Sequence, residues 1–277
     1  MPYNSINTNV AAMQAIAAFN AINAELFEVQ TRITTGRKVN SPKDNPAIWA
    51  IAQNQRSELR ALDSVKGSLQ RNMGVVDVAL SASETVSDLL NQMKALAVSA
   101  QDYDVSSSAR AAINEEYQSL RKQIDTAVSN ATFGGLNLLA GGGSADKVRA
   151  LANTSATSTI DVNHEDMSTG GAMLSGMPAD LLAGLGPTGI ADINAATDRV
   201  NAAVSRLGTG SKALENHLKF VDKQQDVIEE GIGNLVDADL AKESARLQAL
   251  QVRQQLALIA MRIANQQPSY LLQLFQR

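Results

Sequence analysis

The sequence contains no cysteine, few aromatic residues and few prolines. Among its 277 residues none is Cys, 4% are aromatic and six are Pro. The absence of Cys excludes disulfides, thiolate zinc sites and cysteine nucleophiles. The shortage of Phe, Tyr and Trp favours slim helices that pack along their length through Ala, Leu, Ile and Val, and disfavours a compact enzyme core.

The chain also lacks a strong excess of either charge. Its net charge is −4, so no basic surface indicates a nucleic-acid partner. The N-terminal MPYNSINTNVAAM lacks the basic and apolar regions of a secretory signal, and we expect no window of eighteen apolar residues. The sequence therefore predicts no nucleic-acid partner, no membrane insertion and, if the protein leaves a cell, export without a cleaved signal.

Motifs for catalysis, metals and cofactors are lacking as well. The two histidines, His164 and His217, lie on separate predicted segments, and His164-Glu165 is not followed by the second His of a zinc protease motif. The run 184–189 fits GxGxxG by letter, but Pro187 removes an amide that could face a phosphate. We therefore expect no enzyme activity, no metal site and no cofactor.

Glycine divides the chain into helical and irregular parts. Residues 1–130 contain three glycines, whereas 134–189 contain eleven. Apolar spacing predicts helices over about 47–101, 109–131 and 190–236, with Ser108 as an N-cap, and β-prone pieces such as 158–162 predict one or two hairpins. Pro268 is expected to interrupt the last helix. The expected fold is mainly α, with long helices, a terminal coiled-coil pair and a small β-hairpin region around 133–175.

Each end of the chain carries one amphipathic helix whose apolar residues recur at steps of three and four. Neither helix has enough partner surface nearby in the sequence, so the spacing predicts that the two pair with each other. Apolar residues such as Ile16 remain on other faces, and burying them requires neighbouring subunits. The residues expected in the pair and in polymerisation are Phe19, Ile22, Leu26, Val29, Ile33, Val252, Leu256, Ile259, Ile263, Leu271 and Leu272.

A polar Ser/Thr-rich stretch lies in the middle of the chain. Its hydroxyls could accept O-linked glycans if they are exposed, although an ordinary polar surface loop fits the same composition. The candidate acceptors are Thr154, Ser155, Thr157, Ser158, Ser168 and Thr169.

Four motifs, in this order along the chain, resemble those of bacterial flagellins. Near the start, SINTNVAAMQA resembles the family's first residues, and 34–47 resembles its S-T/S-G-x-R-I-N-S-A-x-D-D-A-A loop. Residues 131–135 resemble T-x-F-N-G, and 264–272 resemble A-N-Q-x-P-x-x-x-L. The resemblance covers nearly the whole chain.

The resemblance implies a structural subunit of the extracellular flagellar filament, exported unfolded by the flagellar type III system and used in motility. Implied partners are further copies of the chain in a helical homopolymer, paralogous flagellins, a hook–filament junction protein, the filament cap and a chaperone for the C-terminal helix. Gln92 stands where the family has an Arg in the stretch read by animal Toll-like receptors. Weak or no receptor recognition is therefore expected.

The family also implies a division of the chain. Residues 1–34 and 236–277 would form an inner coiled-coil domain, and 47–133 with 188–235 a domain of long helices. Residues 134–187 would form a short β/loop surface region. Two other functions stay open, a hook–filament junction protein and a surface-displayed adhesin on the same frame.

The break at 35–46 separates the inner helix from the next one. Gly36 suits a helix C-cap, and Pro46 suits the first turn of the following helix, with 43–45 supplying its cap. A flexible linker, a binding loop and an ordered joint all fit such a break. Its closely spaced charged and amide residues favour an ordered joint that contacts adjacent subunits. The residues expected to do so are Gly36, Arg37, Lys38, Asn40, Lys43 and Asp44.

Overall fold

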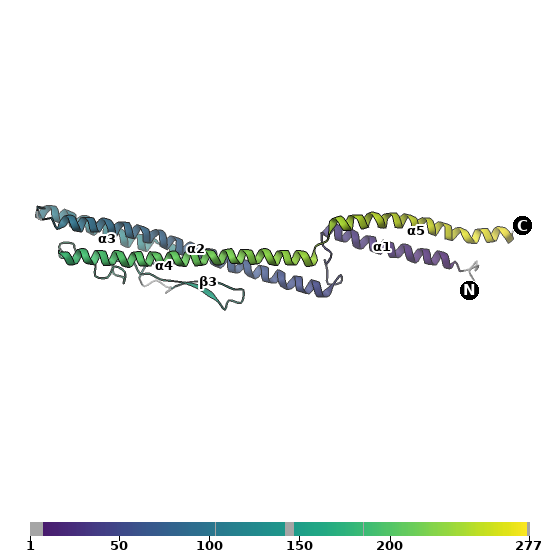
Figure 1. Ribbon diagram of the computed structural model, residues 1–277, viewed down its shortest axis with the longest axis horizontal. Helices are drawn as coiled ribbons and strands as arrows, with labels where there is room; N and C mark the ends of the chain where they lie inside the picture. The colour runs from purple at the N-terminus through teal and green to yellow at the C-terminus, as the bar shows by residue number, and fades with distance from the viewer. Residues whose placement is uncertain (1–7, 103, 142–146, 185, 276–277) are drawn as a thin grey trace. The chain divides into compact units, whose positions relative to one another are not determined.

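The computed structural model of the protein describes residues 8–102, 104–141, 147–184 and 186–275. Within these ranges the chain forms long helices and two short antiparallel strand pairs, β1–β2 and β3–β4 (Figure 1). The predicted mainly α fold with a small β-hairpin region is confirmed. The elements are α1 (Val10–Thr35), α2 (Pro46–Ala100), α3 (Ser107–Asn130), β1 (Thr132–Phe133), β2 (Leu136–Asn137), β3 (Lys147–Leu151), β4 (Thr159–Asn163), α4 (Pro187–Val236) and α5 (Leu240–Phe275).

The chain divides into two compact units. One contains residues 1–57 and 227–277, and the other contains 58–226. The boundaries between them fall inside α2 and α4, whereas the sequence analysis expected a change of domain at 35–46. The first turns of α2 and the last turns of α4 therefore belong to the same unit as the terminal helices.

The helix ends follow local backbone chemistry. Gly36 ends α1 with φ 69°, a left-handed conformation that glycine adopts without steric cost. Asn45 caps α2, because its Oδ1 accepts a hydrogen bond from the amide of Ile48 at 3.1 Å. The prediction of Ser108 as the cap of α3 is wrong. Ser106 has the extended backbone of a cap, and its Oγ accepts from the amide of Ala109 at 3.3 Å.

The prediction that Pro268 interrupts the last helix is also wrong. α5 continues without a break from Leu240 to Phe275. A proline in a helix removes one amide donor. The helix can continue when the carbonyl that loses this donor accepts a hydrogen bond from another group.

The unit of 58–226 has its core between α2, α3 and α4. The fully buried residues include Leu69, Leu90 and Met93 of α2, Tyr117 and Ile124 of α3, and Ile193 and Leu207 of α4. Their recurrence at helical spacing explains why the apolar pattern predicted these helices well.

Residues 134–187 contribute side chains to the core of their unit. Leu138, Leu139, Met167, Leu174 and Leu181 are fully buried. Polar anchors also hold the segment, since the Tyr117 hydroxyl donates to the carbonyl of Pro178 at 2.9 Å and the amide of Leu181 donates to Asn114 Oδ1 at 2.9 Å. These residues lie outside the helices and strands, in a Gly-rich stretch that the sequence predicts as loop, so their burial was not expected.

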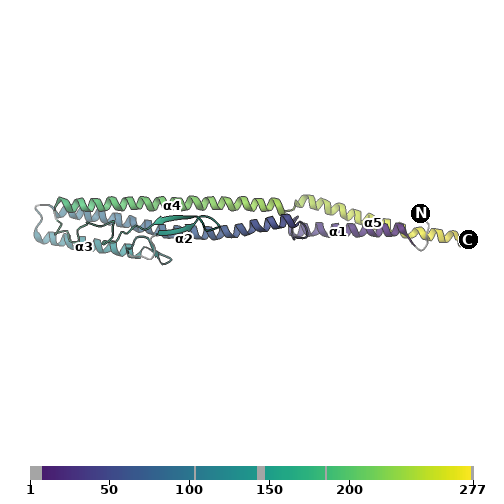
Figure 2. The ribbon, with the colours of Figure 1, turned by 90° about the horizontal axis from the view of Figure 1, so that it is seen from below.

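The β3–β4 hairpin lies against α2 and α4 (Figure 2). Val148 pairs with Val162 in register, and both side chains are buried. The amide of Leu151 donates to Ser68 Oγ of α2 at 3.2 Å, and His217 of α4 bonds the carbonyl of Ala152 at 2.8 Å. The hairpin therefore contributes to the packing of its unit.

We predict opposite effects for Gly208→Ala and Gly210→Ala in α4. Alanine is a better helix former than glycine by about 0.5–1 kcal/mol. A Cβ at Gly208 meets no atom within 4 Å, whereas a Cβ at Gly210 would lie 2.9 Å from Cγ2 of Val162. Gly208→Ala should therefore raise the free energy of unfolding, and Gly210→Ala should lower it by about 1 kcal/mol because the hairpin is forced outward.

Chemical denaturation of the two variants measures this difference. Val162→Ala should relieve the loss in Gly210→Ala. Equal stabilisation by both alanine substitutions would contradict the close packing of β4 on α4.

Candidate assembly surface

The terminal helices α1 and α5 pack side by side, as predicted (Figures 1 and 2). Leu26 and Val29 of α1 are buried against Leu250 of α5, with Ile22, Ile33 and Leu247 packed around them. The less exposed positions of α1 include 12, 15, 19, 22, 26, 29 and 33, with 23, 31 and 32 beside this series, and those of α5 are 243, 247, 250, 254, 257, 261 and 264. Both series alternate steps of three and four, which is the spacing of a coiled-coil seam.

The seam of α5 is not the stripe that the sequence analysis paired with α1. Val252, Leu256, Ile259 and Ile263 are 52–61% exposed. Each follows a seam position by two residues, a rotation of about 200° around the helix, so the stripe lies on the opposite face. We call these four residues the outer stripe. Leu271 and Leu272 lie in α5, but their side chains are outside the described residues.

The seam of α5 was missed because its members are small or polar. Glu243, Gln254 and Ala257 occupy seam positions beside Leu247 and Leu250. Their regular spacing is visible in the sequence, but the outer stripe has the same spacing and higher hydrophobicity. The more hydrophobic of the two stripes faces away from α1.

α1 also exposes apolar side chains on its outward face. Val10, Met13, Ile16 and Phe27 are exposed, and Phe27 is the most exposed of them. α1 is long and apolar enough, by length and composition only, to cross a membrane, which corrects the expectation that no segment would be. Part of the apolar surface of α1 packs against α5, and the expected absence of membrane insertion stays a prediction.

The residues after α1 form an ordered joint that is hydrogen-bonded to the end of α4 and to the short connection between α4 and α5. The carbonyl of Gly36 accepts from the amide of Ala238 at 2.9 Å, and the amide of Lys38 donates to the carbonyl of Val236 at 2.7 Å. Lys38 Nζ also donates to the carbonyl of Asn234 at 2.9 Å. Val39 is buried beside these contacts. Backbone pairing of this kind distinguishes the joint from a flexible linker.

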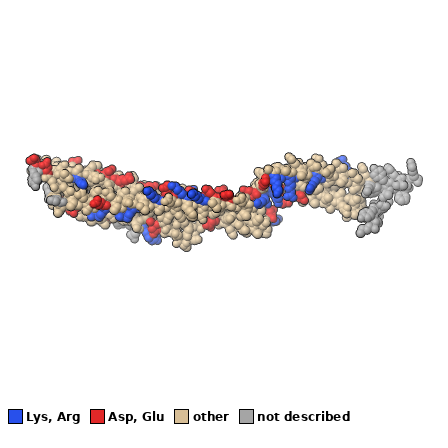
Figure 3. Space-filling view, viewed as in Figure 1, with Lys and Arg blue, Asp and Glu red and all other residues tan. Residues whose placement is uncertain are grey.

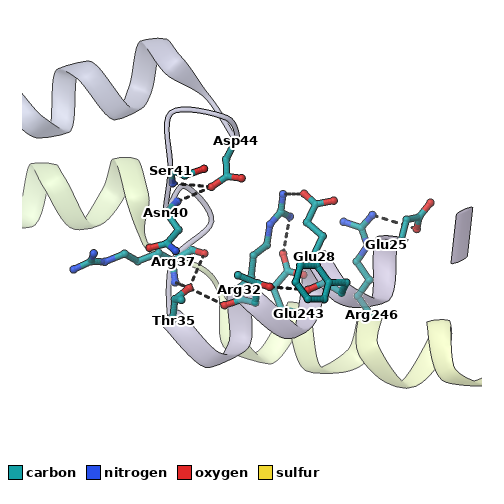
Figure 4. A network of polar contacts seen from close by, with 12 residues as sticks. Glu25, Glu28, Arg32, Thr35, Arg37, Asn40, Ser41, Asp44, Glu243 and Arg246 are labelled. Atoms are coloured by element: carbon teal, nitrogen blue, oxygen red, sulfur yellow. Dashed lines mark hydrogen bonds and ion pairs between the residues drawn. The ribbon is translucent and has the colours of Figure 1, made fainter. Parts of the chain in front are cut away.

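Asp44 organises the second half of the joint (Figure 4). Its Oδ2 accepts hydrogen bonds from the amides of Asn40 and Ser41 at 2.9 and 2.8 Å. These two amides lower the pKa of the Asp44 carboxyl, the Asn40 amide having the larger effect. The ionised carboxylate therefore holds the loop that leads into α2.

Charged residues link α1 to α5 near the joint (Figure 4). Arg32 pairs with Glu28 on its own helix and with Glu243 of α5 at 3.3 Å, and Glu25 pairs with Arg246 at 3.6 Å. In the view of Figure 3, the charged side chains of the terminal pair gather near the joint, and its described surface further along is mostly uncharged. The outward faces of the pair therefore suit apolar contacts.

Two of the six joint residues expected to contact neighbours, Lys38 and Asp44, already form side-chain hydrogen bonds within the chain. In the described part of the chain, only the side chains of Arg37, Asn40 and Lys43 among these six make no hydrogen bond or ion pair. Figure 4 shows the Arg37 side chain pointing away from the α1–α5 network. A hollow of about 160 Å³ opens beside it, lined by Phe27, Arg32, Lys38 and Asp44 among others.

The candidate glycan acceptors fall into two groups. Thr154 donates to Glu58, Ser168 to Asp166 and Thr169 to Asp125, and the Thr157 hydroxyl accepts from Asn153. Ser155 and Ser158 are exposed near the tip of the β3–β4 hairpin, and within the described residues their hydroxyls make no hydrogen bond.

The two histidines have local structural contacts. Each ring bonds a backbone carbonyl at 2.8 Å, His164 that of Ala140 and His217 that of Ala152. Among the residues that the structure describes, no three His, Asp or Glu side chains are grouped so that they could hold a metal ion.

Comparisons with known proteins agree with this architecture. Residues 6–144 match the bacterial flagellin N-terminal helical region, and residues 190–275 match the bacterial flagellin C-terminal helical region. Flagellin FljM of Caulobacter vibrioides is 44% identical over 276 residues, covering 100% of both chains. Flagellin C of Rhizobium meliloti is 33% identical over 321 residues, covering 98% of this chain and 99% of that one.

One solved structure supports the fold alone. A protein from Vibrio parahaemolyticus, described as a flagellar hook-associated protein, has a TM-score of 0.58 and 15% identity. The similarity covers 70% of this chain and 100% of that one.

We predict that acid loosens the joint through Asp44. Because its folded pKa lies below the ordinary 3.8, the ionised carboxylate stabilises the joint above that pH. This stabilisation is lost as the pH falls through the lower, folded pKa. The fluorescence of Trp49, the single tryptophan, should report the change at the start of α2.

Asp44→Ala should show the loosened signal already at pH 7 and lack this acid transition. Asp44→Asn keeps an acceptor without the charge and should be intermediate. An unchanged transition in Asp44→Ala would contradict the role of this carboxylate.

Proposed function

From the premise that this chain belongs to the bacterial flagellin family, we propose that it polymerises through the outward apolar faces of α1 and α5. The protein is a structural subunit of the extracellular flagellar filament and has no enzymatic role. The protein self-assembles, and the outward apolar faces of α1 and α5 are the surfaces that we propose meet between subunits.

The observation that carries the proposal is the outer stripe of α5. Four large apolar side chains at coiled-coil spacing are more than half exposed in the single chain. Fully burying a side chain of this size stabilises a structure by about 1.5–3 kcal/mol. A contiguous exposed stripe of this kind is typical of a surface covered by another chain. In the proposal, helices of neighbouring copies cover it in the filament.

We further propose that the terminal helices become fully ordered during assembly. Among the described residues, the buried cluster between α1 and α5 contains three large apolar side chains, those of Leu26, Val29 and Leu250. The ordering of so many residues costs conformational entropy that this small cluster does not offset. Contacts with neighbouring subunits would supply the remaining stabilisation.

Ordering of the terminal helices during assembly is compatible with export of an unfolded chain by the flagellar type III system. The sequence has no cysteine and hence no disulfide that would resist unfolding. An exposed outer stripe would also need cover before assembly, which supports a chaperone that binds the C-terminal helix. A hook–filament junction protein, the filament cap and paralogous flagellins complete the proposed partners.

The joint is proposed as a second, polar subunit contact. Arg37, Asn40 and Lys43 retain free side chains for it, whereas Gly36, Lys38 and Asp44 would act by holding the joint in shape. Toll-like receptor recognition is proposed to be weak or absent. Gln92 is exposed on α2, and it offers an amide where the family's Arg offers a cation.

The matches to flagellins along the whole chain favour a bulk filament subunit over a hook–filament junction protein. Abundance in sheared filaments separates these two functions. If the protein were an adhesin that displays the 140–185 loops, a variant with shortened loops would still assemble but would no longer bind its target.

We predict that Leu256→Ser with Ile259→Ser abolishes filament formation. The serines remove two neighbouring apolar side chains from the outer stripe and leave the α1–α5 seam unchanged. Sedimentation and electron microscopy would measure assembly, and circular dichroism would check that the helix content of the soluble chain is kept.

Gln255→Ser is the matched control, because Gln255 is exposed on the same turn and lies outside the stripe. It should polymerise like the parent chain. Filaments of normal length from the double serine variant would rule out the outer stripe as an assembly surface.

We propose Ser155 and Ser158 as glycan acceptors in preference to the other four candidates. Their free, exposed hydroxyls are accessible without breaking a hydrogen bond, unlike those of Thr154, Ser168 and Thr169. Mass spectrometry of native filaments should place any added hexose-sized mass on these two serines, and Ser155→Ala with Ser158→Ala should remove it. Modification of Thr169 with both serines unmodified would contradict the assignment.

A further inference from the structure

The carbonyl of Ala264 in α5 lacks its helical donor. In an α-helix each carbonyl accepts from the amide four residues further along, and for Ala264 that residue is Pro268. Proline has no amide hydrogen, yet α5 continues past it to Phe275. A carbonyl left unpaired at a buried position costs free energy, so this one requires a donor from elsewhere.

Asn9, at the other end of the chain, supplies the donor. Its Nδ2 donates to the carbonyl of Ala264 at 2.7 Å. Its Oδ1 accepts from the amide of Ala12 at 3.0 Å and so caps the start of α1. The Asn9 side chain thus forms a hydrogen bond with one otherwise unpaired backbone group on each helix. Ala12 and Ala264 are 8% and 9% exposed, and their small size lets the two backbones approach closely enough for this contact.

A second polar contact lies within the seam itself. Asn23 Oδ1 accepts from Gln254 Nε2 at 2.7 Å, and both residues are half-buried. As the α1 number rises from Asn9 to Asn23, the α5 number falls from Ala264 to Gln254, so the helices are antiparallel. Apolar heptads alone allow slippage by seven residues, whereas buried polar pairs are satisfied in one alignment only.

We infer that Asn9 is a positioning residue that fixes the axial register of the α1–α5 pair. It does so by bonding the Ala264 carbonyl that Pro268 leaves open. After a slip of one heptad towards the C-terminus of α5, Asn9 would face Leu271, whose carbonyl can accept the helical amide of Phe275. The open carbonyl therefore marks one position along α5. The inference rests on the proposed function only in that the pair is formed in the assembled filament.

Engineered cysteines can report the register, because the chain has no cysteine of its own. The side chains of Glu25 and Arg246 are equally exposed, and Glu25 Oε2 lies 3.6 Å from Arg246 Nη2 across the pair. Two cysteines at these positions are too short for a direct disulfide, but a bismaleimide reagent can span the gap left by the two longer side chains. Glu25→Cys with Arg246→Cys therefore reports the observed register. Glu25→Cys with Arg253→Cys reports a slip of one heptad towards the C-terminus of α5, since Arg253 is exposed seven residues further along. Filaments are treated with the reagent, and denaturing gels separate cross-linked single chains from cross-linked dimers.

The informative substitution is Asn9→Asp, which keeps the capping oxygen and loses the donor. We expect the cross-link of the observed register to fall by about fivefold, as for the loss of one such hydrogen bond. The cross-link of the slipped register should rise. Asn20→Asp makes the same chemical change at an exposed site on α1 and should behave like the parent.

Pro268→Ala tests the mechanism, because it restores an amide that can bond the Ala264 carbonyl within α5. In that background Asn9→Asp should change the cross-link by less than about twofold. If Asn9→Asp alone fails to form filaments, their recovery in the double variant supports the inference and continued failure overturns it.

Two further results would overturn it. One is an observed-register cross-link in Asn9→Asp equal to that of Asn20→Asp. The other is a defect in Asn9→Asp that persists in full beside Pro268→Ala. Absence of filaments from the parent chain would instead refute the proposed function, and the same cysteine pairs would then be read on the soluble chain.

Discussion

The structure of the terminal unit depends on one constraint, the pairing of two helices that lie at opposite ends of the sequence. Each helix has a narrow seam with alternating steps of three and four, and the two seams bury Leu26, Val29 and Leu250 between them. The joint that begins at Gly36 is then hydrogen-bonded through backbone groups to the end of α4 and to the short connection between α4 and α5. A seam this narrow leaves most of each helix surface exposed, which is suitable for a subunit whose neighbours complete its core.

Polar residues at the seam lower its hydrophobicity and increase its specificity. Glu243 is nearly buried and pairs with Arg32, while Gln254 meets Asn23. Replacing such groups with leucine could stabilise the pair, but it would also make several alignments equally favourable. A filament repeats any misalignment in every subunit, so a defined register is worth more here than additional burial within one chain.

The sequence allowed much of this to be predicted, and its failures have a common physical origin. The seam residues of α1, the cap at Gly36 and the helix start at Pro46 followed from spacing and backbone chemistry. The seam of α5 did not, because that helix carries two stripes of equal spacing and the more hydrophobic one faces outward. The usual expectation that the most apolar face is buried then applies to the assembled polymer, in which we propose that other chains cover that face.

Two other failures concern residues whose partners are distant in the sequence. The buried leucines of 134–187 lie in turns and irregular segments, so only the tertiary structure shows that they belong to the core. Pro268 was expected to interrupt the last helix, because it has no amide hydrogen to donate to the carbonyl of Ala264. Asn9, 255 residues from Ala264 in the sequence, provides that donor. A rule based on neighbouring residues fails where a distant side chain satisfies the backbone, and such positions are informative about how the two ends of the chain are matched.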